Sequence, residues 1–219
     1  MDKGKALLIY GDQALLVEEE LKKILARIGD EVDPEFNLDF FRAEEEELEE
    51  ALRAAETLPF ASGWRYVVVK EAQRLTPADI KRLVRYLEDP PESATLILVG
   101  VGLKEGSALV KEVGKRGRVR RASLSRREIP LWIKGRFEAR GLRLNGRALS
   151  YLRESLGDDL MAIEAAAEKI SLFHEGRGTV ELDEVVSLVS PSAERTIYEL
   201  VDRVAVGDAD QSLKILRRL

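Results

Sequence analysis

The chain has 219 residues, of which 45% are hydrophobic and 34% are charged, and its formal net charge is -5. This composition is typical of a globular protein with many helices, and the negative charge argues against a generally basic nucleic-acid-binding protein. The absence of cysteine excludes disulfides, thiolate metal sites and a cysteine nucleophile, and the single histidine, His174, leaves almost no material for a catalytic triad or a histidine-rich metal site.

The first 125 residues or so alternate short apolar runs with amphipathic segments. Asp12 is the expected N-cap of the first predicted helix, at 13–27. No apolar run approaches the roughly 20 residues that span a bilayer, and the N-terminus lacks a signal-peptide pattern. Five strands separated by helices predict an α/β domain with a parallel sheet covered on both faces. The spacing predicts strands at 6–10, 36–41, 65–70, 95–99 and 118–122, and helices at 13–27, 45–56, 77–87 and 107–115.

After Ser125 the strand signal stops, and only helical patterns follow. The predicted organisation is therefore an α/β domain over 1–140, a three-helix lid domain over 141–190, and the start of a linker over 191–219. The helices are expected at 125–140, 145–155, 159–173, 183–189 and 194–205, with a last one still running at Leu219.

The turn after the first strand resembles the start of a phosphate-binding site but lacks its chemistry. A P-loop needs a second glycine followed by lysine and Ser/Thr, and none of these follows Gly11 and Asp12. The third strand ends in Lys70 and Glu71, where a nucleotide hydrolase would hold magnesium with an acidic pair. We interpret these four residues as a degenerate nucleotide site, and we expect no catalytic residue, metal or cofactor.

The loop after the second helix carries two large apolar side chains, Leu58 and Phe60, on either side of Pro59. Two interpretations stay open from the residues alone. The side chains could anchor a partner protein, or they could tuck beneath the edge of the sheet.

Residues 111–127 contain eight cations and one acid, Glu112. Such a basic segment suits phosphates or an acidic neighbouring subunit, although no aromatic residue is interleaved for base stacking. The candidate contact residues are Lys111, Lys115, Arg116, Arg118, Arg120 and Arg121.

An ordered set of segments resembles the delta subunits of bacterial DNA polymerase III, and it covers nearly the whole chain. The segments are LLIYGDQALLVEEELKKI, AAETLPFASGWRYVVVKEAQRL, LVRYLEDPPESATLILVG, RREIPLWIKGRFEARGLRLNGRALSYLRESLGDDLMAIEAAAEKISLF and RTIYELVDRVAVGDADQSLKIL.

The resemblance implies a nucleotide-hydrolase-like fold of the AAA+ type that does not bind ATP. It implies a non-catalytic subunit of the clamp loader, which assembles with the tau/gamma and delta-prime subunits. It further implies a cytoplasmic location without a membrane, and a polymerase activity that resides in another subunit. The family binds the sliding clamp (the beta subunit) and opens the ring for loading on primed DNA. Its apolar clamp-binding pair maps onto Leu58 and Phe60, with Pro59 between them. The family's helical collar domain would follow Leu219, so we expect this chain to stop short of it.

Two other functions remain as alternatives. An active nucleotide enzyme with an atypical loop would need a second loop bearing Lys, Ser or Thr near Gly11. A nucleic-acid-binding module that uses residues 111–127 would show a steep salt dependence of DNA binding.

Overall fold

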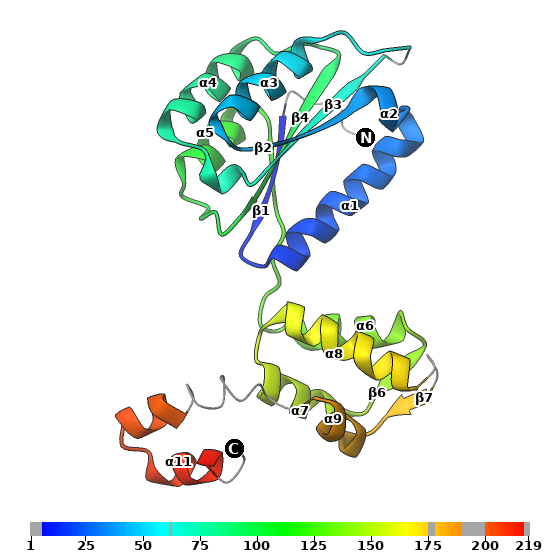
Figure 1. The fold of residues 1–219 in the computed structure, drawn as a ribbon, viewed down its shortest axis with the longest axis vertical. Coiled ribbons are helices and arrows are strands. Elements are labelled where there is room, and N and C mark those ends of the chain that lie inside the picture. The colour runs from blue at the N-terminus through cyan, green and yellow to red at the C-terminus, as the bar shows by residue number, and fades with distance from the viewer. Residues whose placement is uncertain (1–5, 62, 175–177, 190–199, 217–219) are drawn as a thin grey trace. The chain divides into compact units, whose positions relative to one another are not determined.

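The computed structural model describes residues 6–61, 63–174, 178–189 and 200–216, and it divides into two compact units between Ser123 and Leu124 (Figure 1). In this part of the chain, no helix is long and apolar enough to cross a membrane.

The first unit is a five-stranded sheet in which every pairing is parallel, in the order β2-β3-β4-β1-β5. This arrangement confirms the predicted fold class. The strands are β1 (Ala6–Gly11), β2 (Leu38–Arg42), β3 (Arg65–Lys70), β4 (Ala94–Val101) and β5 (Arg118–Arg121). The helices are α1 (Ala14–Glu31), α2 (Pro34–Asn37), α3 (Glu45–Glu56), α4 (Pro77–Glu88) and α5 (Ala108–Arg116), with a 3-10 turn, η1 (Ala72–Arg74).

Helices cover both faces of the sheet, which explains the almost continuous apolar run of its central strand β4. On one face, α3, α4 and α5 enclose a core that includes Leu8, Val67 and Leu96. Because strand side chains alternate, Ile9 and Val68 face the opposite side, where α1 packs on β1 and β4. Figure 1 shows α1 on one side of the sheet, and α3, α4 and α5 on the opposite side.

Several helix starts follow local capping chemistry, but α1, α3 and α6 (Ile129–Glu138) have no side-chain hydrogen bond at the N-cap. Thr76 and Asp79 form a capping box before α4, and Pro77 occupies its first turn. The expected cap on α1 is wrong. Gln13 occupies the N-cap position without a side-chain hydrogen bond, and Asp12 is exposed.

The second strand begins later than predicted because a short helix precedes it. Pro34 takes the first position of α2, and the Asp33 carboxylate accepts a hydrogen bond from the Glu35 N–H at 3.1 Å. Phe36, which was expected in the strand, therefore lies in α2. Proline fixes the φ angle that a first helical turn requires, and this signal outweighs the alternation of Phe36, Leu38 and Phe40.

The second unit is mainly helical, but the prediction of no strands after Ser125 is wrong. Two strands, β6 (Leu142–Leu144) and β7 (Gly178–Val180), form a small parallel sheet. Each has three residues, too few to show an alternating pattern. The helices are α6 (Ile129–Glu138), α7 (Gly146–Leu156), α8 (Leu160–Phe173), α9 (Leu182–Leu188) and α11 (Ala209–Leu216).

The predicted boundary at 140 falls too late in the chain. Helix α6 packs against β6 and α8, and the carboxylate of Glu164 on α8 binds both Arg136 and Arg140 at 3.2 and 2.6 Å. These contacts make α6 part of the second unit. The predicted helix at 194–205 lies partly outside the described residues; 200–205 are helical. The lid and linker roles stay predictions.

Candidate functional site

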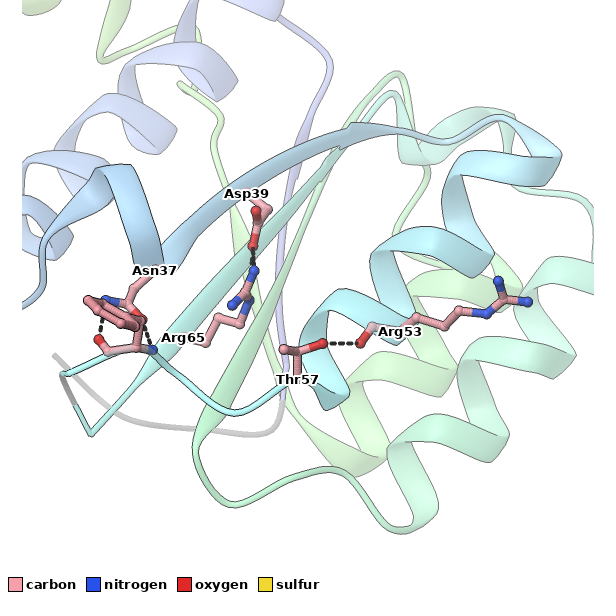
Figure 2. Close-up of polar contacts among 6 residues, drawn as sticks. Asn37, Asp39, Arg53, Thr57 and Arg65 are labelled. Carbon is pink, nitrogen blue, oxygen red and sulfur yellow. Dashed lines mark hydrogen bonds and ion pairs between the residues drawn. The ribbon is translucent and has the colours of Figure 1, made fainter.

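Leu58 and Phe60 lie in the loop that joins α3 to β3, and both are largely exposed, by 81% and 62%. The loop begins where Thr57 Oγ1 donates a hydrogen bond to the carbonyl oxygen of Arg53 at 3.0 Å, closing the last turn of α3 (Figure 2). Pro59 cannot continue the helix. The two side chains are therefore not tucked beneath the sheet, and they are open to a partner. That they bind one stays a prediction.

The backbone of Phe60 is held by the side chain of Asn37, at the end of α2. The Phe60 N–H donates to Asn37 Oδ1 at 2.8 Å, and Asn37 Nδ2 donates to the Phe60 carbonyl oxygen at 2.9 Å. Asn37 is only 1% exposed. Figure 2 shows both hydrogen bonds at the labelled Asn37. Thus a buried amide fixes the residue whose aromatic side chain is presented to solvent.

Two further contacts support the same region. The rings of Phe36 and Phe60 lie 5.1 Å apart, a separation typical of interacting aromatic pairs. Beside the loop, the Arg65 guanidinium of β3 contacts Asp39 of β2 at 2.7 Å (Figure 2). That ion pair is only partly exposed to water, and it joins β2 to β3, the strand into which the loop leads.

Sequence reasoning missed Asn37 and Phe36 as parts of this site. A usable signal was present, because Asp33 followed by Pro34 is the pattern of a capped helix start. A helix there places Phe36 and Asn37 on a turn instead of along a strand. The contact with Phe60 itself spans 23 residues of sequence, and no local pattern announces it.

The degenerate nucleotide site keeps the strand-turn-helix geometry, and its glycine serves packing. A Cβ on Gly11 would collide with the carbonyl oxygen of Ala122 and lie 3.2 Å from a methyl group of Val17. A glycine is thus required at position 11, because the backbone of Ala122, which follows β5, approaches it closely. Asp12 is exposed, with a carboxylate oxygen 4.0 Å from the Arg121 guanidinium.

At the end of β3, the two polar side chains of this site form ion pairs. Lys70 Nζ lies 3.4 Å from Glu18 Oε1, and the Glu71 carboxylate lies 3.0 Å from Arg74 Nε. Glu71 has a left-handed backbone, with φ of 59°. Among the residues described, no group of three or more His, Asp or Glu side chains could hold a metal ion. Lys70 and Glu71 are thus both engaged by oppositely charged neighbours, and the loss of a nucleotide site stays a prediction.

The basic segment is partly neutralised, both by its own acid Glu112 and by acids from outside the segment. Glu112 accepts hydrogen bonds from Lys115 and Arg116 at 2.6 Å each, and these bonds lower the pKa of the Glu112 carboxyl. Arg120 pairs with Glu20 of α1, and Arg121 lies 3.3 Å from Glu105. Lys111 and Arg118 are exposed.

The apolar loop and the degenerate nucleotide site lie at opposite edges of the sheet. Parallel strands place all their amino ends at one edge, and the loop leads into the amino end of β3. Gly11 and Lys70 end their strands at the other edge. Figure 1 shows the turn from β1 to α1 at one end of the sheet and α2 at the other.

Comparison with known proteins identifies relatives of the whole chain. The model of the family described as DNA polymerase III, delta subunit matches residues 7–123. The chain is 26% identical over 218 residues to DNA polymerase III subunit delta of Bacillus subtilis, an alignment that covers 94% of this chain and 63% of the relative. The chain thus spans just under two thirds of that protein.

Solved structures with a similar fold include a protein of the same kind. The Bacillus subtilis DNA clamp loader delta protein is similar with a TM-score of 0.59 and 26% identity, covering 97% of this chain and 66% of that one. The Thermotoga maritima RuvB Holliday junction branch migration motor shares the fold, with a TM-score of 0.53 and 15% identity, covering 84% of this chain and 60% of that one. The fold is therefore of the AAA+ type. Because the family model matches more than half of the residues, the chain belongs to the family of DNA polymerase III delta subunits.

Proposed function

We propose that this chain is a non-catalytic clamp-loader subunit that binds the sliding clamp through Leu58, Pro59 and Phe60. The observation that carries the proposal is the exposure of two large apolar side chains on a loop whose backbone is held in place. The sliding clamp is chosen as the partner because this chain belongs to the family of DNA polymerase III delta subunits and is similar to a clamp loader delta protein. In this role Leu58 and Phe60 enter an apolar pocket on the clamp.

Opening of the ring follows from differential affinity. If the chain binds an open or distorted clamp more tightly than a closed one, its binding shifts the clamp population toward the open state. No chemistry in this chain is needed for that shift. The same role implies assembly with the tau/gamma and delta-prime subunits, action on primed DNA through the complex, and a place in the bacterial cytoplasm.

Direct binding of nucleic acid is the weaker candidate. It would rest on the basic segment at 111–127, yet Lys115, Arg116, Arg120 and Arg121 all form ion pairs within the first unit. Breaking such pairs to contact phosphates would offset part of the gain from neutralising the nucleic acid.

The test is the double variant Leu58→Ala with Phe60→Ala, measured for clamp binding by surface plasmon resonance. Truncating a buried anchor costs about 2–4 kcal/mol, so the double variant should lose at least about a hundredfold in affinity. Because both side chains are exposed, the temperature of thermal unfolding should change little.

The matched control is Leu172→Ala with Phe173→Ala, an equally exposed leucine-phenylalanine pair in the second unit. This control should bind the clamp like the unchanged chain. Normal clamp binding by the loop variant, or equal losses in both double variants, would refute the anchor assignment.

A further inference from the structure

We propose that Asn37 is a positioning residue for clamp binding, which fixes Phe60 in its presenting conformation, and that Phe36 extends the same apolar surface. This inference rests on the proposed function and adds two residues from a different part of the chain. Asn37 does not touch the partner, because it is buried; it acts through Phe60.

The first support is the geometry of the hydrogen bonds. The carbonyl oxygen and the amino group of one side chain pair with the N–H and the carbonyl oxygen of one residue, as a neighbouring strand would. Two bonds in opposite directions define the orientation of that peptide segment as well as its position. Both hydrogen bonds recorded for the Asn37 amide, within the described part of the chain, go to Phe60. Because Asn37 is buried, water competes poorly for either bond.

The second support is the conformation of the loop around Phe60. Pro59 restricts the backbone on one side, and Ala61 has a left-handed backbone on the other, with φ of 52°. A left-handed conformation costs a residue with a Cβ free energy, so surrounding contacts must hold the turn. The two hydrogen bonds from Asn37 are contacts of that kind.

The third support is the neighbouring aromatic ring. Phe36, next to Asn37, lies against the ring of Phe60 at 5.1 Å and is itself 50% exposed. The short helix α2 thus supplies both the side chain that hydrogen-bonds to the backbone of Phe60 and an aromatic ring beside the Phe60 ring. Holding an anchor in its bound conformation lowers the entropy lost on binding, and affinity rises without any new contact to the partner.

The experiment is a double-mutant cycle with Asn37→Ala and Phe60→Ala, read as clamp affinity by surface plasmon resonance. Asn37→Ala should weaken clamp binding about tenfold in the unchanged background. In the Phe60→Ala background it should weaken binding by less than about twofold, because the residue that it positions has lost its side chain. Asn37→Leu, which keeps the branching and the number of side-chain heavy atoms but forms neither hydrogen bond, should behave like Asn37→Ala.

Two measurements separate positioning from general stability. Amide hydrogen exchange at the Phe60 N–H, followed by NMR, should accelerate in Asn37→Ala and Asn37→Leu. Asn145→Ala serves as the matched control, because it removes the asparagine that caps α7 in the second unit. That variant should leave both clamp affinity and exchange at Phe60 unchanged.

The outcomes are distinct. If the unchanged chain does not bind the clamp, the proposed function fails and this inference fails with it. If the unchanged chain binds but the Asn37 variants bind equally well, only the positioning role is overturned. Equal losses in the presence and absence of the Phe60 ring would likewise overturn it, because Asn37 would then act through overall stability.

Discussion

Lys70 and Glu18 form an ion pair across the carboxyl edge of the sheet, with Lys70 Nζ 3.4 Å from Glu18 Oε1. Lys70 ends β3, the position where a nucleotide hydrolase of this architecture carries a magnesium-binding acid. The ion pair therefore places at this position a cation that already has a partner in α1. A divalent ion at this point would meet a positive charge.

We expect the chain to bind no magnesium–ATP. The turn after Gly11 has no lysine for the phosphates, and Lys70 repels the metal. Isothermal titration calorimetry should show heats of dilution only, and a dissociation constant below about 1 mM would contradict the interpretation.

Lys70→Glu is an informative companion variant for the nucleotide prediction. It returns a carboxylate to the end of β3 but restores no phosphate loop, so it should not bind magnesium–ATP either. It also places two carboxylates side by side, and we expect a loss of unfolding free energy of about 0.5 kcal/mol. Nucleotide binding by this variant would show that the metal position alone limits the site.

Gly11→Ala should destabilise the first unit by about 2–3 kcal/mol, because the new Cβ would collide with the carbonyl oxygen of Ala122 and force neighbouring backbone apart. Urea unfolding measures the change. Gly106→Ala is the control: a Cβ at Gly106 meets nothing within 4 Å, and we expect a change within about 0.5 kcal/mol. Equal effects of the two substitutions would show that Gly11 is not needed for packing.

The ion pair between Glu20 and Arg120 should make stability depend on pH. Burial raises the pKa of Glu20, but the hydrogen bond and charge of Arg120, together with Lys23, outweigh it and hold that pKa below its usual value of 4.5. A lowered folded-state pKa contributes stability that is present above 4.5 and is lost as the pH falls through the lowered value.

Glu20→Gln should therefore lower the free energy of unfolding by about 0.5–1 kcal/mol at neutral pH, and the difference should shrink as the pH is taken below 4.5. Urea unfolding across this pH range measures it. Adding Arg120→Met to Glu20→Gln should cost little more, because the pair is already broken. A difference that is constant with pH would show that the carboxylate charge is not the cause.

The sequence predicts elements well where one local signal dominates. The bounds of α3 and β3 agree with those expected, because a strong helical stripe in one and three consecutive valines in the other leave little ambiguity. Helix α2 was missed although Asp33 and Pro34 mark its start, whereas β6 and β7 escape prediction because three residues cannot display a period. They depend instead on packing contacts from elsewhere in the chain.

For the candidate site, composition identifies Leu58 and Phe60 but cannot decide between exposure and burial. The structure decides it, through contacts that join distant segments, such as Asn37 with Phe60. The basic segment shows the reverse effect. Its local excess of cations predicts a positive surface, and Glu20, 100 residues before Arg120, reduces it.

Strand β3 runs from the apolar loop to Lys70, and its six residues separate the two ends by roughly 17 Å at about 3.3 Å per residue. Substitutions at one end therefore need not disturb the other, provided that the buried valines between them are kept. A sheet of this kind can give up a chemical activity at its carboxyl edge while a recognition loop evolves at its amino edge, with the same core preserving both.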